Sequence, residues 1–324
     1  MEVKFLNKKD FEVYSNLSKK YGSVFSYMEW LNIFGKNLHI LGLYDKGNNL
    51  IGGFAIYIKK IGPLRICTNP PFSPNIGLFL KIKDIQNKVT LNSFIKMVIE
   101  SISEFLEKNN FHIISLSFPR QFIDMQPFIW KKFKVIPRYT YIISLDNSEE
   151  DIWKHFSSTR RRYIRKALRE KIECFKLERS DFNIIKILVE KTFLRKNKKI
   201  NLDLLNKIIF SFANDENSFA FASFKNNRPI AVSFCIYDNF SAYYLLGGID
   251  PEVKHHGAGA LSLYNCIKYA KQLKLKYFDF EGSTIPSIER FFRDFGGDLV
   301  PYFRVNKALL PLEIVLKFLK RDLF

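Results

Sequence analysis

Two acidic residues alternate with phenylalanines in the segment KYFDFEGS, residues 276–283. In an extended strand, successive side chains point to opposite faces, so Asp279 and Glu281 share one face with Tyr277. Two carboxylates on one face of an apolar strand are costly to bury unless they pair with a cation or form a site. A carboxylate there can accept a proton from an amine, directly or through water. We therefore expect Asp279 and Glu281 either to pair with Arg160 or to act as catalytic bases.

A glycine-rich turn precedes this strand. The apolar run AYYLLGGID ends in Gly247 and Gly248, and Gly257 and Gly259 precede a clear helical pattern. A glycine turn that opens a helix exposes backbone N–H groups, and the helix dipole adds partial positive charge. Together with Lys254, these glycines predict a binding site for an anionic donor. The alternative is ordinary turn chemistry at a strand–helix junction.

The third candidate group is a basic helix over residues 149–171, with Asn147 or Ser148 as its N-cap. At 100° per residue its apolar side chains form one stripe. This stripe consists of Trp153, Phe156, Tyr163, Ile164, Ala167 and Leu168. The opposite face carries Arg161, Arg162, Arg165, Lys166 and Arg169. A cationic strip of this kind either binds phosphates or is a solvated face.

Arg160 departs from this pattern because its angle places it inside the apolar stripe. A partly buried guanidinium needs a carboxylate, carbonyl groups or a bound anion. We expect Arg160, Arg161 and Arg165 to bind phosphate or substrate, with an internal ion pair as the alternative for Arg160.

The elements that must position these residues occur twice. LGLYDKGNNLIGGFAIYI and FASFKNNRPIAVSFCIYD each predict two strands around a turn, and they align without gaps. Each copy then continues with a strand, a helix, a strand, a helix and a strand. This order predicts a duplicated unit, divided into residues 1–146 and 147–324, with the candidate site in the second. The tail, residues 309–324, packs back on the first unit or lies on an anionic membrane.

Composition limits the classes of protein that remain. The chain has 324 residues, 47% of them hydrophobic, which excludes a mainly disordered protein. Its net charge of +19 suits tRNA, anionic lipid or nucleotide-linked substrates, although AT-rich coding also enriches lysine. The four cysteines form no CxxC pair, so neither a disulfide framework nor a metal site is expected. Without an apolar leader or a membrane-length run, the expected location is the cytoplasm, with the inner membrane face as the alternative.

These motifs together resemble the Fem-type aminoacyltransferases that build peptidoglycan bridges, within the GNAT-like acyltransferase superfamily. The matching patterns are W-x-x-F-x-x-x-x-R-R-x-x-R-K-A at 153–167, the helix at 259–274, FDFEGS, and FFRDFGG at 291–297. The resemblance covers nearly the whole chain. It implies an α/β (α+β) fold of two tandem GNAT-like units, each a mixed central sheet flanked by helices.

The resemblance also implies a reaction. An acyl or aminoacyl group passes from acyl-CoA or aminoacyl-tRNA to an amine of a nucleotide- or lipid-linked cell-envelope precursor, in peptidoglycan or polysaccharide synthesis. No metal is implied. Many GNAT acetyltransferases carry a tyrosine acid where this chain has Phe292, which disfavours standard acetyl-CoA chemistry. The alternatives are a strictly aminoacyl-tRNA-dependent bridge transferase and an inactive basic protein that binds RNA or a membrane surface.

Overall fold

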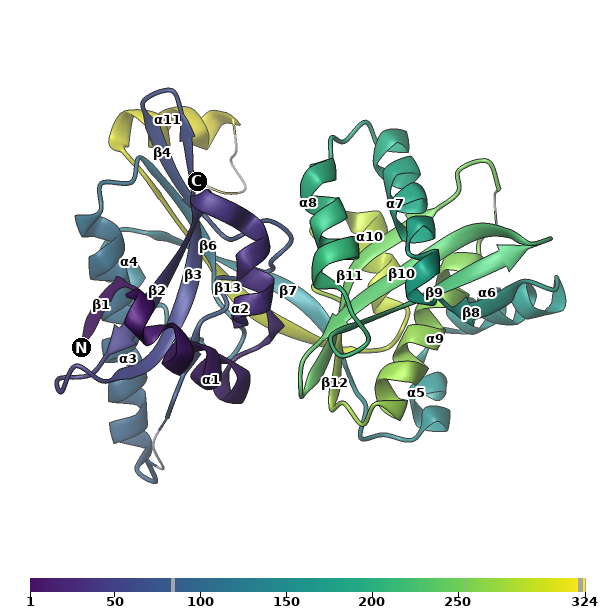
Figure 1. Ribbon diagram of the computed structural model, residues 1–324, viewed down its shortest axis with the longest axis horizontal. Helices are drawn as coiled ribbons and strands as arrows, with labels where there is room; N and C mark the ends of the chain where they lie inside the picture. Colours follow the sequence, from purple (N-terminus) through teal and green to yellow (C-terminus); the bar gives the residue numbers. More distant parts are fainter. Residues whose placement is uncertain (83–84, 254, 320–322, 324) are drawn as a thin grey trace. The chain divides into compact units, whose positions relative to one another are not determined.

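The chain folds into two compact units (Figure 1). The computed structural model describes residues 1–82, 85–253, 255–319 and 323. The first unit consists of Met1–Arg138 and Pro301–Phe324, and the second of Tyr139–Val300.

The first unit is built on a mixed sheet. Across the sheet, its strands are β1 (Glu2–Phe5), β2 (Leu38–Tyr44), β3 (Leu50–Ile61), β4 (Leu64–Thr68), β6 (Ile113–Ser117) and β13 (Asp298–Ala308). The short strand β5 (Phe79–Leu80) pairs with β3. Its α-helices are α1 (Phe11–Tyr21), α2 (Met28–Leu31), α3 (Lys88–Lys108), α4 (Gln126–Trp130) and α11 (Leu310–Leu319). Short 3₁₀ turns lie at Lys8–Asp10, Val24–Ser26 and Asn32–Asn37.

The second unit has a sheet of the same kind. Its strands are, across the sheet, β8 (Glu173–Lys176), β9 (Ser218–Lys225), β10 (Arg228–Tyr237), β11 (Ser241–Ile249), β12 (Tyr277–Asp279) and β7 (Lys134–Ser144). Its α-helices are α5 (Glu149–His155), α6 (Ser158–Arg169), α7 (Asn183–Arg195), α8 (Leu202–Asn206), α9 (Ala258–Gln272) and α10 (Pro286–Arg293). A 3₁₀ turn at Arg179–Asp181 precedes α7, and a π-helical turn at Lys207–Phe212 follows α8.

Helices cover both faces of the second sheet. The Phe234 ring of β10 packs edge-on against Phe182 at the start of α7. On the other face, the hydroxyl groups of Ser233 in β10 and Ser262 in α9 lie 2.9 Å apart. Successive residues of β10 thus point to α7 and to α9 alternately, as the pleat of a strand requires.

The two sheets repeat one pairing pattern. In each, three antiparallel pairs are followed by one parallel pair and a final antiparallel pair. The parallel pairs are β4–β6 and β11–β12, and each is linked by one long helix, α3 or α9. The predicted fold class, two tandem units each with a mixed sheet flanked by helices, is confirmed.

The last strands of the two repeats are exchanged. In the chain, β7 follows β6 and α4, but its residues Ile142, Ile143 and Ser144 pair with β12 in the second unit. Conversely, β13 follows α10, but Arg304–Ala308 pair with β6 in the first unit. The division therefore differs from the predicted 1–146 and 147–324, because the chain crosses between the units within β7 and within β13.

The predicted basic helix is two helices. Phe156 adopts an extended conformation with ψ of 143°, which ends α5. The Ser157 side chain then accepts a hydrogen bond from the Arg160 N–H and caps α6. Because the helical phase restarts at this break, a single wheel over 149–171 does not relate the residues of α5 to those of α6. Within α6 the buried residues are Arg160, Ile164 and Ala167, whereas Leu168, predicted in the apolar stripe, is 56% exposed.

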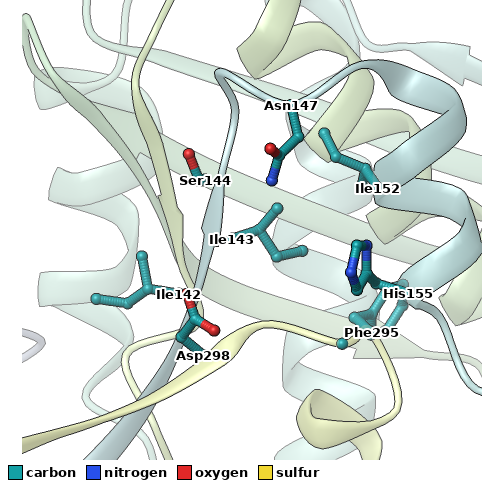
Figure 2. A pocket seen from close by; sticks show the side chains of 9 residues that line it. Ile142, Ile143, Ser144, Asn147, Ile152, His155, Phe295 and Asp298 are labelled. Atoms are coloured by element: carbon teal, nitrogen blue, oxygen red, sulfur yellow. The ribbon is translucent and has the colours of Figure 1, made fainter.

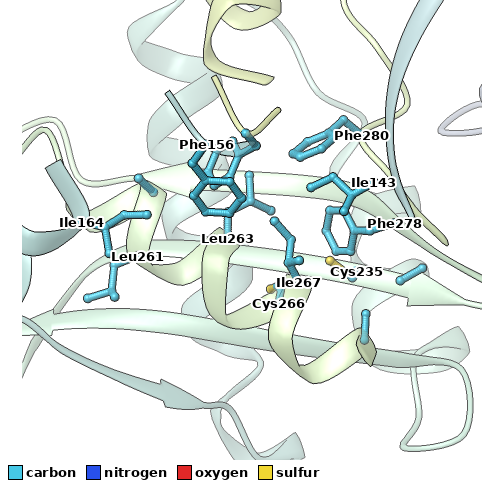
Figure 3. Packing of buried hydrophobic residues seen from close by; sticks show 14 of the residues in the cluster. Ile143, Phe156, Ile164, Cys235, Leu261, Leu263, Cys266, Ile267, Phe278 and Phe280 are labelled. Carbon is cyan, nitrogen blue, oxygen red and sulfur yellow. The ribbon is translucent and has the colours of Figure 1, made fainter. Parts of the chain in front are cut away.

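A cluster of buried side chains fixes β12 in the second unit (Figure 3). Phe278 and Phe280 are almost fully buried, with ring centroids 5.3 Å apart. Leu263 and Ile267 of α9 and Phe156 belong to the same cluster. With the phenylalanines held in the core, the alternation of the strand directs Asp279 away from it.

Among the described residues, no helix combines the length and the hydropathy that a bilayer span requires.

We expect Gly257→Ala to destabilise the second unit, because its Cβ would lie 2.2 Å from the Tyr163 carbonyl oxygen. Overpacking of this kind costs about 1–3 kcal/mol. Gly259→Ala is the matched control, since its Cβ would meet nothing closer than Ile249 at 3.5 Å. Alanine there favours the helix by about 0.5–1 kcal/mol. Urea unfolding measures both, and equal midpoints for the two variants would contradict the close approach at Gly257.

Candidate active site

Asp279 ends β12, between β7 and β11. Its Oδ1 accepts a hydrogen bond of 2.6 Å from the Thr140 hydroxyl of β7. The same oxygen accepts a bond of 2.8 Å from the backbone N–H of Glu281. Asp279 therefore joins two strands and orients the backbone that carries the second acid.

Two left-handed residues follow Phe280, the first residue after β12. Glu281 has φ of +58° and Gly282 has φ of +71°. A side chain on Gly282 would lie 2.0 Å from the Tyr139 carbonyl oxygen, so only glycine fits there. A left-handed conformation is uncommon for glutamate and costs of order 1–3 kcal/mol. The turn thus holds Glu281 in a strained conformation that the neighbouring strand defines.

The burial of the Glu281 carboxyl group is not fully offset by hydrogen bonds. The residue is partly exposed as a whole, but its Oε1 is buried and has no hydrogen-bond partner among the described residues. Burial, and secondarily the negative charge of Asp279, raise the pKa of Glu281 well above its ordinary value of 4.5. A carboxyl group with a raised pKa holds its proton to higher pH than an ordinary glutamate and can act as a general acid.

The strand beside β12 diverges from it. Parallel pairing of β11 with β12 covers only Ser241–Tyr243 against Tyr277–Asp279, whereas β11 continues to Ile249 paired with β10. Gly247 and Gly248 lie on the stretch of β11 that pairs with β10 but not with β12. They lie inside the strand and not at its end as predicted. A Cβ on Gly248 would lie 2.6 Å from the Leu188 backbone, so the absence of a side chain here allows α7 to pack closely against β11.

The second predicted glycine turn opens α9. Gly257 is buried against α6, and its N–H donates to Nδ1 of His255. The His255 Nε2 lies 3.1 Å from Glu170 at the end of α6. Gly257 therefore serves helix packing, and Gly259, which is partly exposed, remains the predicted donor contact. Lys254 lies outside the described residues.

Arg160 is committed to internal partners. Its guanidinium lies 4.2 Å from the Phe291 ring centroid and 4.6 Å from that of Phe295. Its Nη2 donates to the Phe291 carbonyl at 2.9 Å and lies 3.5 Å from the Asp294 carboxylate. Burial lowers the pKa of Arg160 to about 10, so it stays protonated at neutral pH. A structural role replaces the predicted phosphate clamp, and the partner is Asp294 instead of Asp279 or Glu281.

The other two predicted arginines differ from each other. Arg161 donates through Nη1 to the carbonyls of Lys154 and Phe156, at 2.6 and 2.8 Å, and so caps the end of α5. Arg165 is exposed and lies 5.7 Å from the Trp153 ring. A surface hollow of about 580 Å³ is lined by Arg162, Arg165, Leu168 and Arg169. Of the three predicted arginines, Arg165 is the one placed to meet an external anion.

Sequence reasoning missed the contribution of β7. Thr140 bonds Asp279, and the Tyr141 hydroxyl donates to Glu289 of α10 at 2.7 Å. The sequence RYTYIIS does predict this strand, but its position in the chain places it in the first repeat, away from Asp279. At the end of β7, Ser144 helps line a small cavity of about 80 Å³ together with Asn147, His155 of α5 and Asp298 of β13 (Figure 2). That volume suits a few water molecules and not an acyl donor.

No group of three or more His, Cys, Asp or Glu side chains that could hold a metal ion occurs in the part of the chain that the structure describes. All four cysteines are free.

We expect Arg160→Ala to lower the free energy of unfolding by about 3 kcal/mol. The variant removes the buried guanidinium and leaves the partly buried Asp294 carboxylate without its cation. Arg165→Ala is the exposed control and should stay within about 0.5 kcal/mol of the parent protein. Guanidinium denaturation compares the two. Similar stabilities would show that Arg160 is not a structural residue.

The raised pKa of Glu281 predicts how stability depends on pH. The folded state keeps a proton that the unfolded state loses above about pH 4.5, so stability falls as pH rises towards the folded pKa. Each unit of pKa shift corresponds to about 1.4 kcal/mol. Glu281→Gln removes this titration and should be more stable than the parent protein at pH 8, with little difference at pH 4.5. Thermal melts across this range measure it, and Glu173→Gln, on the exposed edge strand β8, should retain the parent profile.

Comparison with known proteins gives one family match, over the segment that contains the candidate site, and several solved structures of similar fold. Residues 157–293 match the family described as acetyltransferase (GNAT) domain. No curated protein sequence gives a significant match. Among solved structures, FemX has a TM-score of 0.69 at 14% identity, covering 98% of this chain and 100% of that chain. L-PGS from Bacillus licheniformis has a TM-score of 0.58 at 12% identity, covering 99% and 98%.

A tandem GNAT protein from the clavulanic acid biosynthesis pathway has a TM-score of 0.51 at 8% identity, covering 94% of this chain and 98% of that chain. At such identities these likenesses establish the fold. The matched segment 157–293 contains α6, the turn before α9 and both carboxylates of the candidate site. Both findings support the resemblance to the Fem-like GNAT superfamily: residues 157–293 match the GNAT acetyltransferase domain family, and the whole chain shares its fold with FemX.

Proposed function

We propose that this chain is an N-acyltransferase that forms an amide on an amine of a cell-envelope precursor. The observation that carries the proposal is the carboxyl group of Glu281, buried and uncompensated at the end of β12 in the GNAT domain. A strongly perturbed acid at a diverging pair of strands is typical of a functional site. Asp279 supplies a second carboxylate close by.

The reaction needs two proton transfers. The acceptor amine attacks the carbonyl carbon of a thioester or ester, the new C–N bond forms, and the C–S or C–O bond breaks. One proton leaves the nitrogen and one joins the leaving thiolate or alkoxide. Protonated Glu281 supplies the proton of the leaving group, and the Asp279 carboxylate accepts the proton of the amine, directly or through water.

Phe292 supports this assignment to Glu281. Phe292 occupies the position that the family resemblance gives to a tyrosine acid, and its ring is buried against Phe280 and Tyr244. A phenyl ring cannot protonate a leaving group. A carboxyl group whose pKa is raised by burial can replace a phenol in that role.

The donor in the proposal is acyl-CoA or aminoacyl-tRNA. Both carry phosphates, for which the start of α9 at the partly exposed Gly259 and the hollow along α6 offer positive potential. The arginine-lined hollow extends over the outer face of α6 and suits a large polyanion, which favours aminoacyl-tRNA as the second, stricter form of the proposal.

Turnover with a panel of labelled acyl-CoA and aminoacyl-tRNA donors and amine acceptors tests the proposal. We expect Glu281→Gln to lower kcat at least 100-fold with little change in KM, because acid–base catalysis contributes about 10²–10⁴. The rate of the parent enzyme should fall as pH rises through the pKa of Glu281. Glu173→Gln is the control and should match the parent. Undiminished turnover by folded Glu281→Gln would remove Glu281 from the mechanism.

A further inference from the structure

Helix α11 presents a large apolar face to solvent. Only Leu312, Glu313 and Leu316 are half-buried, and no residue of the helix is fully buried. The exposed apolar residues are Leu310, Pro311, Ile314, Val315, Phe318 and Leu319. At 100° per residue they cover one continuous half of the helix. With Phe318 85% exposed, this face is far more apolar than an ordinary protein surface.

The tip of a hairpin lies at the same end of the first unit (Figure 1). The Leu309 N–H donates to the His112 carbonyl, and the His112 N–H donates to the Arg65 carbonyl. This row of hydrogen bonds links the start of α11 to Arg65, which pairs with Lys60 near the tip of the β3–β4 hairpin. At this tip the hairpin exposes Ile61, which is 60% accessible, together with Lys59 and Lys60.

The charges around this apolar face are mainly positive. Lys59 and Lys60 lie on the hairpin, and Lys317 borders the apolar half of α11. Glu313, the acidic residue of α11, is half-buried and lies 3.2 Å from Lys317. An apolar helix face bordered by lysines is the pattern of a helix that lies in a membrane interface.

A second copy of the chain fits this surface poorly. A helix of ten residues is about 15 Å long. One face of so short a helix buries much less than the roughly 800 Å² per partner of a stable interface. Two chains of net charge +19 also repel each other, whereas an anionic bilayer attracts both.

We propose that α11 and the tip of the β3–β4 hairpin form a docking surface for an anionic lipid bilayer. The exposed side chains of α11 and Ile61 enter the boundary between headgroups and acyl chains, and the lysines meet lipid phosphates. This surface is independent of the proposed acyl transfer. It would keep the protein beside any acceptor that is anchored to a lipid.

Vesicle co-sedimentation of the full chain tests the surface. We expect binding to vesicles that mix phosphatidylglycerol with phosphatidylcholine, and much weaker binding to pure phosphatidylcholine. The triple variant I314S/V315S/F318S should bind at least tenfold more weakly, and it should fold normally because all three side chains are exposed. The double variant V89S/I123S removes two equally exposed apolar side chains elsewhere in the first unit and should bind as the parent does.

The charge contribution is tested by K59Q/K60Q, which should lower the affinity for anionic vesicles about thirtyfold. Equal binding of the triple variant and the parent, or no preference for anionic vesicles, would overturn the proposal. A dimer in sedimentation velocity that the triple variant abolishes would also overturn it, in favour of a self-association surface. Glu281→Gln should retain full vesicle binding, so failure of the chemistry and failure of docking are distinguishable.

Discussion

The burial of Phe278 and Phe280 is the constraint on which the candidate site depends. Both rings are held in the core of the second unit, which fixes the register and face of β12. Asp279, between them, must then point to the other face, where the Thr140 hydroxyl meets it. The left-handed turn after Phe280 places Glu281 beside the same carboxylate. Apolar packing thus brings together two acids that would otherwise repel each other.

The same core determines which cation is available to these acids. Phe280 packs against Phe295, and the Arg160 guanidinium also lies over the Phe295 ring, with Asp294 as its ion-pair partner. Because the guanidinium is already paired and desolvated, it does not neutralise Glu281. The Asp294 carboxylate of the FFRDFGG segment therefore helps to hold α6 against α10, and burial together with Asp279 keeps the pKa of Glu281 raised.

Local periodicity was enough to predict the repeated hairpins, the long helices α3 and α9 and the phenylalanine face of β12. It failed where the partner is distant or the phase is broken. A strand pattern does not specify its neighbour, so the exchange of β7 and β13 could not be read from the sequence. Nor could the partner of Arg160, since Asp294 is 134 residues away. The end of α5, by contrast, could have been predicted from the sequence, because serine is a common N-cap residue and Ser157 caps α6. A continuous helical wheel does not take such caps into account.

Glu281 lowers the stability of the folded chain, and this favours a functional role for its carboxyl group over a structural one. Its left-handed backbone and its buried, unpartnered Oε1 both oppose folding, and a glutamine or glycine would avoid at least part of that cost. A carboxyl group that served packing would be expected to have a cation beside it, as Asp294 does. Neither the turn nor the core gains from an acid at this position. The remaining physical reason for a carboxyl group at position 281 is its proton, which burial and the negative charge of Asp279 make harder to remove.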